Sequence, residues 1–410
     1  MNARSYVLVK LRELEWSTLI FVILLSASGL IAIYSIEAQH DSSAGYFFRQ
    51  SIWTVIGIAL FFITYLIPRK VMHNLAYPAY GLSIILLLFP IFMKSGGAVS
   101  RWIMIGSIGI QPSEFMKIFL LLALAKYFAD HNRKLSNVKE IMTPVAMTLG
   151  PTIMVLAQPD LGTALVYFGI LIVIIFWAGI RPLHFFLLLA PILSMLAAFQ
   201  TISFFVWMGV IIVILYFNQL PFWTKILNFF INVGLGGITN LLWGLLKPYQ
   251  QQRIISMIDS DSDPLGAGYQ VSQSLTAFGS GGPFGKGFGQ GTQTHLKFLP
   301  EQHTDFIMTV IGEEFGFVGV MVVIVLFYLL IAKLITQAYN SKFRFDSVIL
   351  IGISAIYIFH IFVNLGMIVG IMPVTGIPLP FISYGGSFMV TSMVLAGLSV
   401  NMSTTRRAIS

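Results

Sequence analysis

Three aspartates at alternate positions open the longest polar stretch of the sequence. Asp259, Asp261 and Asp263 are followed by Pro264 and by nine glycines between positions 266 and 291. Alternate acids bind Ca²⁺ in an EF-hand, but that motif needs a glutamate at its twelfth position, and this sequence lacks it. A metal site is therefore not specified. A carboxylate whose backbone is fixed by neighbouring Pro and Gly is instead a reasonable general base for a hydroxyl group.

The glycines of this stretch allow the backbone to approach a bulky ligand closely. Exposed amides together with Lys286 could cradle a pyrophosphate or a sugar. The alternative is a flexible surface loop without a ligand, and spacing alone leaves both interpretations open.

Glu114 and Lys117 are three residues apart within an apolar segment, so a helix would place them on one face. A lone charge near the centre of a bilayer costs about 2.5–3.5 kcal/mol on insertion scales. We therefore expect the two side chains to form a pair or to face a polar cavity. The spacing is consistent both with a structural ion pair and with direct substrate contacts.

Several other polar residues lie near the ends of apolar segments. Asp160 follows one segment and precedes the next, which is typical of a helix N-cap. His303 and Asp305 precede the segment that starts near residue 307, and His303 is a candidate substrate contact. Of the adjacent acids Glu313 and Glu314, we expect one to face a polar interior, because acids rarely face lipid.

Residues 373–387 contain prolines at 373, 378 and 380 and glycines at 376, 385 and 386. This pattern forbids a continuous helix and predicts a broken or re-entrant segment that lines protein rather than lipid. Ser383 and Tyr384 within it could donate hydrogen bonds to a sugar.

The composition determines which elements position these residues. Hydrophobic residues make up 57% of the 410-residue chain and charged residues only 10%, so the chain needs lipid as its solvent. It contains no cysteine, which excludes disulfides and thiolate metal sites. The basic N-terminus leads into an apolar stretch without a small-residue cleavage site, which indicates a membrane anchor and not a cleaved signal peptide.

We expect one all-α domain over residues 1–410, a polytopic transmembrane bundle of 10 to 12 spans. Twelve segments are long enough, or nearly so, to cross a hydrocarbon core of about 30 Å. They centre on residues 17–37, 50–67, 74–94, 113–129, 142–158, 161–180, 183–199, 203–217, 222–246, 307–337, 347–371 and 386–402.

Basic residues recur in alternate connections between these segments. With a cytoplasmic N-terminus, the cytoplasmic side receives Arg69, Lys70, Arg133, Lys134, Lys139, Arg181, Lys225, Lys342, Arg344, Arg406 and Arg407. This positive-inside pattern predicts that both termini are cytoplasmic and that residues 247–306, before the last three spans, form an extracytoplasmic loop. A long polar connection of this kind is usually functional.

Five blocks of sequence resemble, in order, the shape, elongation, division and sporulation (SEDS) family of membrane proteins. They are SRWIMIGSIGIQPSEFMK (100–117), AQPDLGTAL (157–165), the stretch from Asp263 to Ile307, NLGM (364–367) and PVTGIPLPFISYGGS (373–387). The blocks extend along nearly the whole chain, so chance matching is negligible. GTQ at 291–293 and the LPEQHTDFI run are more similar to the elongation-type than to the division-type members.

The resemblance implies a peptidoglycan glycosyltransferase of the bacterial inner (cytoplasmic) membrane, which polymerises lipid II and releases undecaprenyl pyrophosphate. Asp263 aligns with the family's essential acid and would be the catalytic base. The substrate-binding candidates are Arg101, Glu114, Lys117, Asp160, Lys286, Gln293, His303, Asp305 and Ser383. Arg101, Lys286 or a divalent cation such as Mg²⁺ or Mn²⁺ would stabilise the pyrophosphate charge. The implied partner is a class B penicillin-binding protein, and no nucleic acid is expected.

The chain departs from the family pattern before the long loop. The usual members have ten spans, whereas this sequence has an extra apolar stretch at about 200–245. Two added spans or one long interfacial helix would both fit. Ser260 also replaces a proline that is common after the first acid of the loop, which leaves Asp263 in register.

A lipid II flippase is the main alternative function, because intramembrane charges and broken helices suit a transport pathway. A flippase should depend most on Glu114 and Lys117, whereas a polymerase should depend on Asp263 in the outer loop. A scaffold that only recruits a penicillin-binding protein predicts that no single acid matters for turnover. Within the family, the alternative is a division-type glycosyltransferase.

Overall fold

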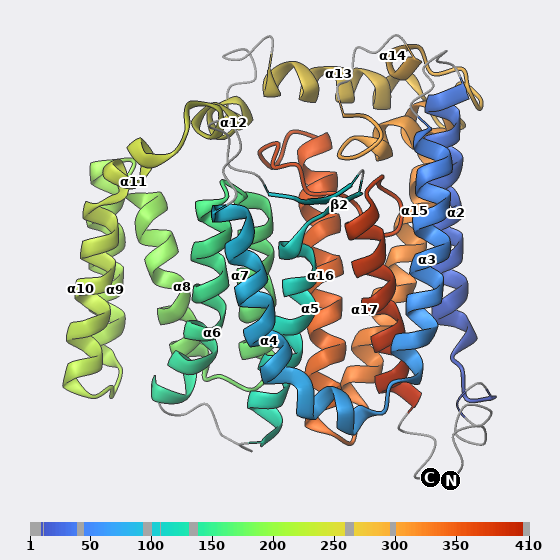
Figure 1. Cartoon of the computed structure of the whole chain (residues 1–410). Coiled ribbons are helices and arrows are strands. Elements are labelled where there is room, and N and C mark those ends of the chain that lie inside the picture. The colour runs from blue at the N-terminus through green and yellow to red at the C-terminus, as the bar shows by residue number, and fades with distance from the viewer. Residues whose placement is uncertain are drawn as a thin grey trace.

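The computed structural model describes residues 10, 12–38, 45–92, 101–106, 108–130, 138–258, 266–295 and 301–404. Helices form most of this part of the chain, which confirms the predicted all-α class (Figure 1). The helices before the long polar stretch are α2 (Trp16–Ala38), α3 (Tyr46–Leu66), α4 (Arg69–Phe92), α5 (Pro112–Asp130), α6 (Val138–Ala157), α7 (Leu161–Trp177), α8 (Pro182–Ala197), α9 (Thr201–Phe217), α10 (Phe222–Gly237) and α11 (Thr239–Leu245).

The remaining helices belong to the polar stretch and to the last third of the chain. They are α12 (Pro248–Ile258), α13 (Ala267–Ser280), α14 (Thr292–His295), α15 (Ile307–Tyr339), α16 (Arg344–Ile368) and α17 (Gly386–Thr404). Each of the twelve expected segments thus coincides with a helix or, for 222–246, with the pair α10 and α11. Seven of the described helices are long and apolar enough to cross a membrane, or eight if the bent pair forms one span. The predicted count of 10 to 12 spans stays a prediction.

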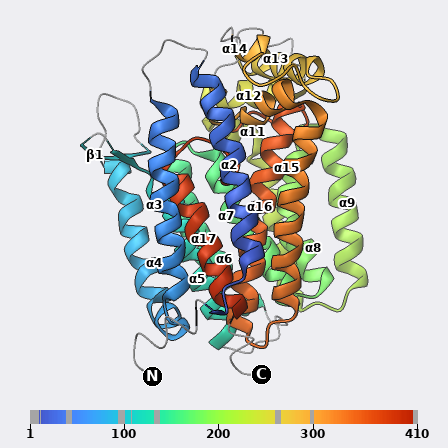
Figure 2. The ribbon, with the colours of Figure 1, turned by 90° about the vertical axis from the view of Figure 1, so that its right-hand side faces the viewer.

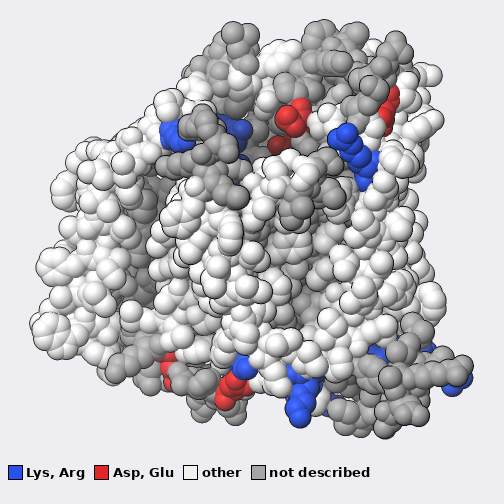
Figure 3. Space-filling view, viewed as in Figure 1, with Lys and Arg blue, Asp and Glu red and all other residues white. Residues whose placement is uncertain are grey.

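The two ends of the bundle differ in what they carry. Helix α2 begins and α17 ends at one end, while α12, α13 and α14 cover the other (Figures 1 and 2). In the space-filling view of one face, the coloured Lys, Arg, Asp and Glu side chains gather towards these ends, with an uncharged band between them (Figure 3). This distribution is expected of a bundle whose middle lies in hydrocarbon.

Helices α5, α16 and α17 lie in the middle of the bundle and are buried over most of their length (Figure 1). Small residues allow close approach there. A Cβ added to Gly397 of α17 would lie 2.3 Å from the backbone oxygen of Phe61 in α3. The two helices therefore touch through their backbones, as small residues permit in membrane bundles.

Breaks interrupt the helical pattern at three places. Gly316 in α15 has φ 66° and ψ −163°, and α10 and α11 meet at a bend of 49°. Residues 369–385 are not helical, which confirms the broken segment predicted from the prolines and glycines. A short antiparallel hairpin, β1 (Ile103–Ile105) and β2 (Ile108–Ile110), precedes α5 and was not expected.

The extra apolar stretch forms a separate side of the molecule. Helices α8, α9 and α10 pack on one another at the edge of the bundle (Figure 1). Ser194 of α8 donates to Oδ1 of Asn232 at 2.6 Å, and Nε1 of Trp207 donates to Ser194 at 2.9 Å. Such polar contacts join helices where lipid supplies no hydrophobic drive for association. Helices α8 and α9 also share a small apolar core of Leu187, Ala190, Met208, Ile211 and Leu215, and Phe229 of α10 packs against it.

Candidate functional site

A polar cavity of about 500 Å³ has six charged residues in its wall. Its walls come from the starts of α5 and α7, from α12 and α16, and from the segments around residues 101, 301–305 and 375–385. It lies at the end of the bundle that carries α12–α14. Four of the candidate residues line it, namely Arg101, Glu114, Asp160 and Asp305.

Arg101 and Asp160 form one wall of the cavity at the junction of α6 and α7. Asp160 is the N-cap of α7 and accepts hydrogen bonds from the backbone N–H and hydroxyl of Thr163 at 3.1 and 3.0 Å. The side-chain amide of Gln111 donates to Oδ2 of Asp160 at 3.2 Å. The guanidinium of Arg101 donates to the backbone oxygens of the two residues that precede Asp160. The N-cap prediction is confirmed, and the same acid also faces the cavity.

Glu114 and Lys117 form the pair that their spacing allows. Nζ of Lys117 lies 2.8 Å from each carboxylate oxygen of Glu114, and both residues are buried. Nζ also lies 3.2 Å from Nε2 of His360 in α16. Because an ammonium only donates, Nε2 must accept, and Nδ1 of His360 therefore donates to the backbone oxygen of Pro378 at 2.9 Å. This chain of hydrogen bonds joins the pair to the broken segment.

Asp305 faces the cavity directly before α15. Its carboxylate makes no hydrogen bond to another described residue, although its backbone oxygen accepts from Asn364 at 2.9 Å. Burial and the nearby Glu301 raise the pKa of Asp305 to about 7, against the opposing effect of the Arg253 guanidinium. Glu301 itself has φ 53°, a left-handed backbone conformation that is strained for a residue with a side chain. Because its pKa is raised to about 7, the carboxyl group of Asp305 can change its charge near neutral pH.

His303 and Ser383 support the cavity wall through packing and backbone contacts. The ring of His303 stacks on Tyr46 at 4.5 Å between centroids, and burial lowers its pKa. Ser383 is buried: its hydroxyl donates to the backbone oxygen of Thr304 at 2.6 Å and accepts from the N–H of Leu379 at 2.8 Å. Tyr384, by contrast, lines the cavity itself.

Lys286 and Gln293 lie elsewhere, around Glu313 of α15. Oε1 of Glu313 lies 2.7 Å from Nζ of Lys286 and accepts from the N–H groups of Thr292 and Gln293 at 2.8 and 3.0 Å. Glu313 is fully buried, which confirms that one of the two adjacent acids faces a polar interior. Neither Lys286 nor Gln293 lines the cavity. Both residues tie the glycine-rich turn to α15. Their predicted substrate contacts remain predictions.

The glycines of this turn serve the packing against α15. The N–H groups of Lys286 and Gly287 donate to the backbone oxygens of Glu313 and Glu314 at 3.0 Å each. A Cβ added to Gly316 would lie 2.3 Å from the backbone nitrogen of the glycine at position 285. Close backbone approach, which the sequence suggested for a ligand, is thus used here between two segments of the chain.

Asp263, the candidate base, lies outside the described residues, as do Asp259 and Asp261. The sequence missed His360 and Arg253 as cavity residues. His360 is a single histidine in an apolar helix, and Arg253 had no partner in any motif. A histidine within an apolar segment is a signal for a functional site, as a buried charged pair is, because polar groups inside a membrane are costly.

No group of three or more His, Asp or Glu side chains that could hold a metal occurs among the described residues. The acids of the cavity come from separate elements.

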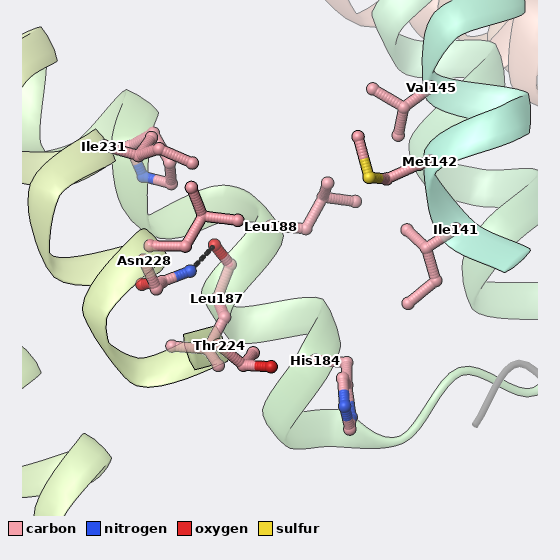
Figure 4. Close-up of a pocket in the computed structure, with 11 residues that line it drawn as sticks. Ile141, Met142, Val145, His184, Leu187, Leu188, Thr224, Asn228 and Ile231 are labelled. Atoms are coloured by element: carbon pink, nitrogen blue, oxygen red, sulfur yellow. Dashed lines mark hydrogen bonds between the residues drawn. The ribbon is translucent and has the colours of Figure 1, made fainter. Parts of the chain in front are cut away.

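A second cavity, of about 220 Å³, separates the α8–α10 side from the rest of the bundle. It lies between α6, α8 and α10, and its walls are apolar except for His184, Thr224 and Asn228 (Figure 4). Nδ2 of Asn228 donates to the backbone oxygen of Leu187 at 3.3 Å. None of the candidate residues that the structure describes lines this cavity.

Comparisons with known proteins find relatives along nearly the whole chain. The chain is 31% identical to peptidoglycan glycosyltransferase RodA of Treponema pallidum over 95% of this chain and 97% of that protein. It is 34% identical to peptidoglycan glycosyltransferase MrdB of Escherichia coli, over 97% and 95%.

Solved structures share the fold. A chain from a peptidoglycan synthase complex that coordinates polymerization and crosslinking superposes with a TM-score of 0.71 at 28% identity, covering 96% of this chain and 98% of that one. The crystal structure of Thermus thermophilus RodA gives 0.62 at 26% identity, over 96% and 97%. The family model for FtsW, RodA and SpoVE, described as cell cycle protein, matches residues 15–208 and 192–408. The chain therefore belongs to the FtsW, RodA and SpoVE family.

Proposed function

We propose that this chain is a peptidoglycan glycosyltransferase that polymerises lipid II during cell elongation. The observation that carries the proposal is the polar cavity at the α12–α14 end, in a multi-pass chain that spans nearly the full length of RodA and MrdB. Both relatives are named peptidoglycan glycosyltransferases. A reaction on a sugar carried by a membrane lipid needs such a polar cavity within reach of the membrane surface.

The proposed reaction is a displacement at the anomeric carbon of the lipid-linked donor. A hydroxyl of the incoming lipid II forms the new C–O bond, and the bond between the anomeric carbon and the pyrophosphate oxygen breaks. The pyrophosphate leaves with the electron pair, and Asp263 takes the proton of the hydroxyl. One displacement inverts the anomeric centre, so an α-linked donor becomes part of a β-linked polymer.

The cavity residues have distinct tasks in this proposal. Arg101, fixed by two backbone oxygens, contributes positive potential at one wall of the cavity. Such preorganised charge stabilises the developing pyrophosphate without reorganisation during the reaction. Lys117 and Glu114 fix the floor of the cavity and add no net charge. Lys286 is engaged by Glu313 and does not line the cavity, so it is given no contact with the leaving group.

The partner and the location follow from the same proposal. A class B penicillin-binding protein would crosslink the strands, as the related synthase complex coordinates polymerization and crosslinking. The protein would lie in the inner membrane with both termini cytoplasmic and α12–α14 outside. This places the cavity at the surface where new strands are needed.

The experiment that tests the function is a gel assay of lipid II polymerisation by purified full-length protein with its transpeptidase. We expect glycan strands from the wild type and none from Asp263→Asn. Asp261→Asn, two residues away, is the matched control and should keep activity. Polymerisation at the wild-type rate by Asp263→Asn would remove this residue from the mechanism.

A second measurement, on a wider set of variants, distinguishes a flippase from a polymerase. If the chain only moves lipid II across the membrane, purified protein yields no strands, and loss of transport follows Glu114 and Lys117 and not Asp263. A polymerase loses strand synthesis in Asp263→Asn even in detergent, where no membrane has to be crossed.

A further inference from the structure

Arg253 of α12 occupies the boundary between two cavities. It lines the polar cavity of about 500 Å³ and also a smaller one of about 180 Å³. The smaller cavity lies between α12, α13 and the chain that leaves α16, where Val271 and Val369 belong to its wall. A side chain in a shared wall can reach a ligand that extends from one cavity into the other.

Arg253 also differs from the other cations of the site in its hydrogen bonds and ion pairs. Lys117 is held by the glutamate and the histidine described above, and Arg101 by two backbone oxygens. Within the described walls of the two cavities, Arg253 is the cation whose side chain makes no hydrogen bond or ion pair. Its guanidinium lies 5.7 Å from the ring centroid of Tyr249, a contact that leaves the N–H groups available.

The negative charges around Arg253 are near but do not touch it. Asp305 and Glu301 line the same cavity, and the field of Arg253 acts on Asp305. At that distance the acids partly offset the positive charge of the guanidinium but accept no hydrogen bond from its N–H groups. An anion that enters the cavity can therefore form the hydrogen bonds that these acids do not.

We propose that Arg253 binds the diphosphate group of the lipid-linked substrate at the junction of the two cavities. The inference rests on the proposed function, because that function supplies the lipid diphosphate. A planar guanidinium with five donors matches two phosphate oxygens at once, which an ammonium cannot do. The head group then lies on the side of Asp160 and Arg101.

Binding to purified full-length protein in detergent tests this assignment. The probes are undecaprenyl diphosphate, undecaprenyl monophosphate and inorganic pyrophosphate, and the variants are Arg253→Gln, Arg253→Lys and Arg181→Gln. We expect Arg253→Gln to bind undecaprenyl diphosphate about 10- to 100-fold more weakly, the range for lost charge-assisted hydrogen bonds. The affinity of Arg253→Lys should lie between those of Arg253→Gln and the wild type. Arg253→Gln should weaken the binding of the monophosphate less than that of the diphosphate.

Arg181→Gln is the matched control, because Arg181 is exposed and precedes α8, away from both cavities. It should bind like the wild type. Weakening of inorganic pyrophosphate in Arg253→Gln would support recognition of the diphosphate itself, and an effect confined to the undecaprenyl probe would support a lipid-linked ligand. Wild-type affinity of Arg253→Gln for undecaprenyl diphosphate would overturn the proposal.

The polymerisation assay separates this proposal from the function on which it rests. If the wild-type protein makes no strands, the proposed function is refuted. The binding measurements would still test whether Arg253 binds the diphosphate. If the wild type is active, Arg253→Gln should raise KM for lipid II more than it lowers kcat. A folded Arg253→Lys with partial recovery excludes a defect of folding as the cause.

Discussion

Nζ of Lys117 lies within hydrogen-bond distance of both oxygens of Glu114 and of Nε2 of His360, a residue 243 positions later in the chain. This arrangement fixes a buried cation beneath the polar cavity. Glu114 and His360 line the cavity, whereas Lys117 does not belong to its wall. Glu114 therefore belongs both to the buried pair and to the cavity wall, and a direct substrate contact of either residue stays a prediction.

The first prediction concerns the pair itself. Glu114→Ala and Lys117→Ala should each lower folded yield and activity, because removal of one partner of a buried pair costs about 3–5 kcal/mol. Exchanging the two residues should recover folded yield more than activity, since a glutamate at position 117 would face the accepting Nε2 of His360. Size-exclusion chromatography and lipid II polymerisation measure the two effects. Full recovery of activity would contradict the role of His360.

The second prediction concerns His360, which accepts from Lys117 and donates to the Pro378 oxygen. His360→Gln should keep most of the activity, because a glutamine amide can accept and donate in the same two directions. His360→Leu leaves the Pro378 oxygen and one Lys117 donor unpaired, which costs about 1–3 kcal/mol for each group. Thermal unfolding and strand synthesis should both rank glutamine above leucine. Equal activity of the two variants would show that only the volume of the side chain matters.

The third prediction uses the pKa of Asp305, which is raised to about 7. Below that pH the carboxyl is mostly neutral, and above it the cavity gains a negative charge beside Glu301, Asp160 and Glu114. Binding of undecaprenyl diphosphate should therefore weaken as the pH rises through the pKa of Asp305. Asp305→Asn removes this charge change and should bind more evenly over the same range. The diphosphate titrates in both proteins, so the difference between the two pH profiles is the quantity to measure, and identical profiles would refute the prediction.

The fourth prediction concerns the anchor of the glycine-rich turn. Glu313→Gln removes the charge that Lys286 and two backbone N–H groups share, so the turn should detach from α15. Limited proteolysis should then cut residues 281–293 faster than in the wild type. Lys342→Met, a change at an exposed lysine of another connection, is the control and should leave the rate unchanged. Equal cleavage of Glu313→Gln and the wild type would refute the anchoring role.

Much of the fold could be predicted because hydrocarbon imposes its demands locally. A run of about 20 apolar residues must be a helix to satisfy its backbone in lipid, and each expected segment proved helical. The broken segment at 373–387 and the Glu114–Lys117 pair also followed from residues a few positions apart. The sequence did not predict finer features, such as the break at Gly316 and the β1–β2 hairpin, where the chain is shaped by neighbours that are remote in sequence.

The sequence by itself thus determined the membrane class, the helices and the family, through composition, periodicity and motifs. The tertiary structure decided which polar residues meet: Lys117 with His360, Lys286 with Glu313, and Arg253 at the boundary between two cavities. The physical reason is that lipid solvates every apolar face of a helix equally well, so an apolar segment does not specify its neighbours. Contacts between remote polar residues are fixed only when the helices pack.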